Sequence, residues 1–144
     1  MYNSFTQVRL EMKKSINKNF ENIKNMKVVF DKISPELLIK MPYEYSGRDI
    51  WVEIETNEFT CICPWSKLPD FASLRIKYIP QKYCVELKSL KYYLQSYREV
   101  GIVHESVVNK IFDDINKCIS PKKLYVELEF YIRGGIKTVV KREK

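Results

Sequence analysis

The sequence has little of what marks membrane, metal-binding or secreted proteins. Its longest apolar runs are only a few residues, whereas a membrane-spanning helix needs about 20. One histidine and four cysteines, with no C-x-x-C pair, argue against a zinc site. The first four residues lack the charged and then apolar layout of a secretory signal. We therefore expect a protein without bound metal and without a membrane span, located in the reducing cytoplasm.

Composition and charge are those of an ordinary globular domain. A chain of 144 residues can bury a core without disulfides, and we expect a single domain over residues 1–144. The net charge of +7 suits a nucleic-acid surface, attraction of an anionic small molecule, or simple solubility. Because the basic residues are scattered and not grouped, the sequence gives little weight to a nucleic-acid partner.

The N-terminal segment carries weak signals. Ile16, Phe20 and Ile23 recur at helical spacing, which permits a short amphipathic helix within residues 1–26. A frayed N-terminal arm is equally compatible with this polar stretch. Residues 26–30 then form a β-favouring patch.

From Arg48 onward the pattern predicts paired strands. Apolar and polar side chains alternate over residues 50–56 and again over 71–79, as they do in half-buried strands. These two runs flank the loop from Cys63 to Asp70, so we expect them to pair in antiparallel fashion.

Two helices and two further strands follow. Leucines at helical spacing predict a helix over residues 86–98, and a second apolar stripe predicts another over 105–119. Residues 124–132 alternate again, and after a Gly-Gly turn a short return strand is expected over 136–140. The order predicts an α+β fold, an antiparallel sheet with two helices on one face.

Cys63 lies just past the first of these strands, and Asp70 follows it across a Pro-bounded loop. A thiol at a strand end is poorly placed for core packing but well placed to meet a substrate. Free cysteine titrates near ~8.5, so a modest environmental effect gives useful thiolate at neutral pH. Taken alone, Cys63 has a simpler explanation, because most cysteines after an apolar run are buried and inert.

Five short segments together resemble a known family. Residues 86–93, Glu-Leu-Lys-Ser-Leu-Lys-Tyr-Tyr, match the signature motif of the QueF family of NADPH-dependent nitrile reductases. Residues 59–64, 69–72, 104–105 and 133–135 look like the other landmarks of that family, in the expected order. The resemblance covers roughly the last two-thirds of the chain.

The resemblance implies a fold and a reaction. The family has the T-fold (tunnelling fold), in the order ββααββ, and its subunits join their sheets into rings with active sites at the boundaries. A homo-oligomer of stacked pentameric rings, a decamer, is therefore expected here. The family reaction, a step of queuosine biosynthesis for tRNA modification, reduces 7-cyano-7-deazaguanine to 7-aminomethyl-7-deazaguanine with two NADPH. No G-x-G-x-x-G is present, so we expect no Rossmann unit to hold the cofactor.

The resemblance assigns the chemistry to two residues. Cys63 is carried over as the nucleophile that forms a covalent thioimide, because a nitrile is itself a poor hydride acceptor. Asp70 is carried over as the proton donor to the nitrile nitrogen, and burial among Leu68, Pro69 and Phe71 would favour its protonated form. An Asp that simply forms a turn after Pro is the plainer explanation.

Substrate contacts are also carried over. His104 and Glu105 are expected to bind the substrate, and His104 to relay protons as well. Capping of the second helix would explain both residues without a ligand. Val85, Glu86 and Leu87 are carried over as a second substrate-binding strip.

Three cations are carried over as cofactor contacts. Lys88, Lys91 and Arg133 would hold the NADPH phosphates, although a solvated basic helix face explains the lysines equally well. The sequence departs from the family in two respects. Cys61 is a second thiol, expected on the same strand face as Cys63, and the chain ends soon after the Arg-Gly-Gly turn, where some relatives continue.

Two other functions compete with the reductase. QueF-like amidinotransferases of archaeosine synthesis act on a cyano-deazaguanine already inside tRNA and add ammonia, but those relatives lack the octet at residues 86–93. A small basic RNA-binding module would need aromatic side chains on an exposed strand face. Tyr78, Tyr125 and Tyr131 are the candidates, and we expect them instead in the core or at a subunit interface.

Overall fold

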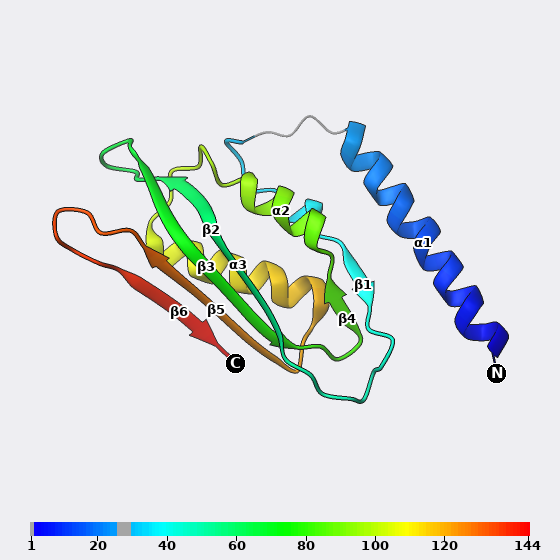
Figure 1. Ribbon diagram of the computed structural model, residues 1–144. Coiled ribbons are helices and arrows are strands. Elements are labelled where there is room, and N and C mark those ends of the chain that lie inside the picture. The colour runs from blue at the N-terminus through cyan, green and yellow to red at the C-terminus, as the bar shows by residue number, and fades with distance from the viewer. Residues whose placement is uncertain (1, 26–29) are drawn as a thin grey trace.

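The computed structural model describes residues 2–25 and 30–144 and has a mixed α+β fold (Figure 1). The helices are α1 (Tyr2–Asn25), α2 (Leu87–Gln95) and α3 (His104–Ile119), with a 3-10 turn η1 at Pro35–Leu37. The strands are β1 (Lys40–Pro42), β2 (Val52–Ile62), β3 (Pro69–Ile79), β4 (Tyr83–Val85), β5 (Lys123–Phe130) and β6 (Val139–Glu143).

Four of the strands form one antiparallel sheet in the order β2-β3-β5-β6. The register pairs Cys61 of β2 with Asp70 of β3, at the end of the sheet where the chain loops between the two strands. A bulge between Thr56 and Phe59 shifts the β2–β3 register. A bulge adds a residue to one strand and increases the local twist. A separate pair of short strands, β1 and β4, is also antiparallel.

The hydrophobic core lies between this sheet and the helices. In β3 the alternate residues Ala72, Leu74 and Ile76 are buried, because successive side chains of a strand point to opposite faces. They pack in one cluster with Ile111 and Ile115 of α3. The other face of the sheet is polar, and it carries ion pairs between neighbouring strands such as Arg75–Glu55 at 3.1 Å.

The helix α1 lies to one side of the sheet in Figure 1, next to β1. Arg9 of α1 donates to the carboxylate of Glu44 at 2.6 Å, an exposed ion pair of a kind that contributes little to stability. The β-favouring patch predicted at residues 26–30 falls largely on residues 26–29, which lie outside the described residues. Phe30 itself is in a turn.

The predicted antiparallel pairing of the first two long strands is confirmed, as is the α+β class. The first strand was predicted too short, because β2 continues through its bulge to Ile62. The return strand is shifted toward the C-terminus: Arg133 and Ile136 bridge only to each other, and the ladder with β5 begins at Val139. The β1–β4 pair was not predicted, since three-residue strands give no periodic signal.

Candidate active site

A cavity of about 350 Å³ lies at the end of the sheet where β2 ends and β3 begins. It collects side chains from segments far apart in the sequence: the β2–β3 loop, the start of α3 and the loop after β5. We call it the Cys63 pocket. Its lining residues are Cys63, Pro64, Trp65, Asp70, Ile102, Val103, His104, Glu105, Tyr131, Arg133, Ile136 and Thr138.

A short bridge brings α3 to this place. The N–H of Ile62, the last residue of β2, donates to the carbonyl of Val100 at 2.9 Å, and the N–H of Ile102 donates to the carbonyl of Ile62 at 3.0 Å. These two hydrogen bonds fix the segment that leads into α3 beside the end of β2. As a result His104, the first residue of α3, faces the same cavity as Cys63.

The loop after β2 surrounds the Cys63 thiol with hydrogen-bond donors. The Cys63 N–H donates to the Leu68 carbonyl and the Lys67 N–H to the Cys63 carbonyl, both at 2.9 Å. Hydrogen bonds from the Ser66 side chain, then from the backbone of Ser66 and Trp65, lower the pKa of the Cys63 thiol. Burial and the charge of Asp70 act in the opposite direction and do not reverse the shift. The thiolate, the form that acts as a nucleophile, is therefore easier to reach at Cys63 than in a free cysteine.

The neighbouring thiol of Cys61 is in the opposite situation. Cys61 is fully buried on the core face of β2, and burial raises the pKa of its thiol to about 12. All four cysteines of the chain are free thiols. Of this pair, only Cys63 combines access to the cavity with a lowered pKa, so the two thiols are not chemically equivalent.

Asp70 is 4% exposed, and its carboxylate has two partners. His104 Nε2 lies 3.0 Å from one oxygen, and Arg133 donates to the other. The expectation that apolar neighbours surround this carboxyl was wrong. Leu68 and Phe71 are 57% and 46% exposed, and the groups that actually meet Asp70 are a guanidinium and an imidazole.

His104 is held by stacking as well as by its contact with Asp70. Its ring lies parallel to that of Phe130, with 3.5 Å between centroids and an interplanar angle of 4°. Glu105 is exposed in the first turn of α3, where a carboxylate suits the helix dipole. The N-cap of α3 is Val103, with no side-chain cap hydrogen bond, so the capping explanation for His104 and Glu105 was wrong. Glu105 also lines the cavity, which leaves a ligand role open to it.

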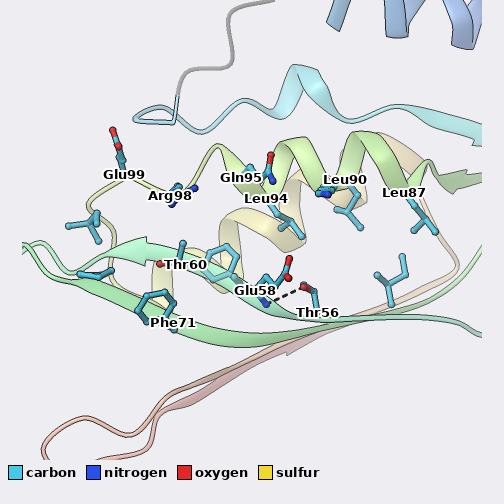
Figure 2. Close-up of a pocket in the computed structure, with 15 residues that line it drawn as sticks. Thr56, Glu58, Thr60, Phe71, Leu87, Leu90, Leu94, Gln95, Arg98 and Glu99 are labelled. Carbon is cyan, nitrogen blue, oxygen red and sulfur yellow. Dashed lines mark hydrogen bonds between the residues drawn. The ribbon is translucent and has the colours of Figure 1, made fainter. Parts of the chain in front are cut away.

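The remaining predicted residues lie elsewhere. Leu87 and Lys91 line a second and larger cavity of about 940 Å³ between α2 and β2, which we call the α2–β2 groove (Figure 2). Val85 is buried in the core. The carboxylate of Glu86 caps α2, accepting from the N–H groups of Lys88 at 3.0 Å and Ser89 at 2.7 Å.

The α2–β2 groove is lined by leucines of α2 and by polar residues of β2, Thr56, Glu58 and Thr60. Figure 2 shows Leu87, Leu90 and Leu94 of α2 reaching toward the strands, with Gln95 and Arg98 nearer the other end. Among the residues that the structure describes, none lines both cavities. Within one chain, the structure thus gathers Cys63 and its partners in one place and the start of α2 in another.

Several residues in or beside the Cys63 pocket were missed from the sequence. Ser66 is the main donor to the thiol, and nothing in its spacing announces that role. Lys67, with a φ of 61°, gives the loop its tight turn, and a left-handed lysine has no sequence signal. Trp65 is 79% exposed at the edge of the cavity, where an aromatic residue next to the Cys63-Pro64 pair was a signal that sequence reasoning passed over.

Two expected absences can be compared with the structure. Within residues 2–25 and 30–144, no three His, Cys, Asp or Glu side chains are grouped so that they could hold a metal ion. Over the same part of the chain, no helix has the length and apolar character to cross a bilayer.

Comparisons with known proteins agree with the motifs. A family model described as QueF-like protein matches residues 69–144. The NADPH-dependent 7-cyano-7-deazaguanine reductase of Caldicellulosiruptor bescii is 53% identical over 111 residues, or 77% of this chain and 85% of that protein. The reductase of the same name from Thermoanaerobacter pseudethanolicus is 51% identical over 117 residues, 80% of this chain and 88% of that protein.

A solved structure is also similar. The crystal structure of the archaeosine synthase QueF-Like in the apo form matches with a TM-score of 0.61 at 25% sequence identity, covering 65% of this chain and 91% of that one.

Proposed function

The chain belongs to the QueF-like protein family, and we propose that it is an NADPH-dependent reductase of the nitrile of 7-cyano-7-deazaguanine. The product is 7-aminomethyl-7-deazaguanine, and the biological role is queuosine biosynthesis. Relatives at about 50% identity carry the name of this activity. The observation that carries the proposal is a Cys63 thiol with a lowered pKa that opens into a cavity shared with Asp70 and His104.

The first step uses this chain's own residues. The Cys63 thiolate adds to the nitrile carbon, one C–N π bond breaks, and the nitrogen takes a proton from Asp70, giving a thioimide. His104, 3.0 Å from the Asp70 carboxylate, returns a proton to Asp70. When bound, NADPH would supply two hydrides in two rounds. After the first reaches the thioimide carbon, the carbon–sulfur bond breaks, which frees the Cys63 thiolate and leaves an imine, and the second reduces that imine carbon to the amine level.

The remaining cofactor and substrate contacts are proposed from the family pattern. The lysine side chains at Lys88 and Lys91 are suited to phosphate as compact cations, and Lys91 lines the large α2–β2 groove. We keep Lys88, Lys91 and Arg133 as cofactor contacts, and Glu86 and Leu87 as substrate contacts. Val85, whose side chain is buried, would contribute through its backbone groups.

We further propose a T-fold assembly in which a second copy completes the site. The strands β2 and β6 are the two outer strands of the sheet, and an open edge is a template for pairing with another chain. Ile132, Ile136 and Val139, on the β6 side, are 66%, 72% and 44% exposed, and the apolar α2–β2 groove lies on the β2 side. If the β6 side of one subunit binds the β2 side of the next, the contact joins two different surfaces and repeats head to tail into a ring. Stacked pentameric rings remain our prediction.

Ring closure would also explain the separation of the predicted residues. The Cys63 pocket of one subunit would face the start of α2 in its neighbour, so that Glu86 and Leu87 reach a substrate bound at the neighbour's Cys63. A reducing cytoplasm is the location we propose, which suits four free thiols.

The direct test is to mix the protein with free 7-cyano-7-deazaguanine and NADPH and to follow the loss of NADPH absorbance. Intact mass spectrometry without NADPH should show a covalent adduct of the substrate's mass. Cys63→Ala should lose both signals, whereas Cys84→Ala, which changes a half-buried thiol outside the cavity, should keep both. Turnover by Cys63→Ala at the wild-type rate would refute the mechanism.

One observation favours a second candidate function. The similar solved structure is an archaeosine synthase, which makes amidinotransfer to a cyano-deazaguanine in tRNA the alternative. The octet at residues 86–93 favours the reductase. Activity only with modified tRNA and an ammonia source, and none with free base and NADPH, would favour the synthase.

A further inference from the structure

Arg133 stands apart from the two lysines with which the family pattern groups it. Its guanidinium contacts Asp70 inside the Cys63 pocket, whereas Lys91 lines the α2–β2 groove. Asp70 has only 6% of its side chain exposed, and that of Arg133 is 43% exposed. The contact is therefore a mostly desolvated carboxylate held by a cation that reaches in from the surface.

A tight backbone turn fixes the position of Arg133. The N–H of Arg133 donates to the carbonyl of Ile136 and the N–H of Ile136 donates to that of Arg133, both at 3.0 Å. Between them Gly134 and Gly135 have φ values of 57° and 77°. Positive φ at both central positions defines a two-residue turn that glycine adopts readily. The Arg-Gly-Gly motif thus forms a tight turn that presents the arginine to Asp70.

We propose that Arg133 is a positioning residue for Asp70 in the thioimide-forming step, in addition to any contact that it makes with cofactor. The inference rests on the proposed function. Arg133 binds one carboxylate oxygen and His104 approaches the other, so the carboxyl group cannot rotate away from the cavity.

The proton balance of that step follows from this arrangement. The Cys63 sulfur bonds to the nitrile carbon, and the proton that reaches nitrogen leaves Asp70 as a carboxylate, which Arg133 stabilises as the charge develops. His104 then restores the proton. The titratable and charged groups that line the Cys63 pocket together with Asp70 are Cys63, His104, Glu105, Tyr131 and Arg133. Cys61 lies opposite Asp70 in the β2–β3 register.

The test measures the rate of adduct formation in the absence of NADPH. Under this condition, a role of Arg133 in cofactor binding cannot change the rate. The variants are Arg133→Gln, Arg133→Lys and Lys137→Gln, and the probe is free 7-cyano-7-deazaguanine at a series of pH values. Lys137 is the matched control, because it lies on the same hairpin and pairs with Glu129 at 2.5 Å outside the cavity. Circular dichroism melts establish that each variant is folded.

Arg133→Gln should form adduct about 10²-fold more slowly, the scale of a misplaced catalytic group. Its rate–pH profile should move to higher pH, because loss of a cation favours the protonated form of every acid near it. Arg133→Lys should restore the profile and part of the rate, and Lys137→Gln should match wild type.

Three results would overturn parts of this reasoning in different ways. Wild-type adduct rate and pH profile in Arg133→Gln, with only the KM for NADPH raised, would overturn the positioning role and leave the proposed function intact. An Arg133→Lys variant that forms adduct slowly, and whose rate–pH profile stays at higher pH than that of wild type, would also contradict the positioning role. No adduct with wild-type protein would instead refute the proposed function.

Discussion

Replacing Glu86 by Ala tests whether this residue of the signature octet holds α2 in place. The carboxylate accepts from the N–H groups of Lys88 at 3.0 Å and Ser89 at 2.7 Å, two of the donors that the first turn of a helix leaves unsatisfied. Loss of an N-cap side chain costs about 0.5–2 kcal/mol. Because Glu86 satisfies two donors, we expect a loss near the upper end, about 1.5–2 kcal/mol.

The assay is urea unfolding followed by circular dichroism, with thermal melting as a second measure. At about 2–4 °C per kcal/mol for a chain slightly longer than this one, Glu86→Ala should melt several degrees below wild type. Glu36→Ala, an exposed carboxylate in the short η1 turn, is the control and should stay within about 0.5 kcal/mol. If Glu86→Ala unfolds at the wild-type urea concentration, the cap does not stabilise α2 and our assignment is wrong.

Three further changes have expected outcomes. Ser66→Ala removes the strongest donor to the Cys63 thiol, so the pH dependence of iodoacetamide alkylation at Cys63 should move to higher pH. An unchanged profile would argue against the loop as the source of the lowered pKa. Asp70→Asn should bind substrate but lose most thioimide formation, and a normal adduct yield by mass spectrometry would contradict its role as proton donor. Ile111→Ala empties a fully buried site in α3 and should cost about 2–5 kcal/mol in urea unfolding, and a cost below 1 kcal/mol would mean that the core collapses around the gap.

The spacing of apolar residues was sufficient to predict elements whose pattern lies within one continuous segment of the sequence. The alternation in 71–79 predicted β3 to within two residues at its start, and the stripe ending at Ile119 predicted α3. Each of these patterns depends on neighbours within one element, which the sequence displays directly. The bulge in β2 and the three-residue β1 and β4 strands depend on partners elsewhere in the chain, so no local pattern announced them.

The same distinction holds for the site: contacts within one hairpin could be predicted from the sequence, and contacts between distant segments could not. Cys63 and Asp70 were predicted as neighbours because a hairpin joins them, and the register pairs Cys61 with Asp70. Tyr78 was one of three stacking candidates for RNA that we expected instead in the core or at an interface, and its 1% exposure places it in the core. The Arg133 contact with Asp70 joins residues 63 positions apart, and only the three-dimensional pairing of β3 with β5 reveals it.

The position of Glu86 shows why one chain gives an incomplete view of the proposed site. Its carboxylate already satisfies two helix N–H donors, and a carboxylate has about four lone-pair positions for acceptance. The cap therefore leaves capacity for a ligand on the outer side, and it fixes the direction of that side at the start of α2. Among the described residues, none from α2 lines the Cys63 pocket, so under the proposed ring assembly a substrate that contacts both would lie between two copies. The proposed substrate role of Glu86 therefore depends on that assembly, and a monomer that turned over substrate at the wild-type rate would refute it.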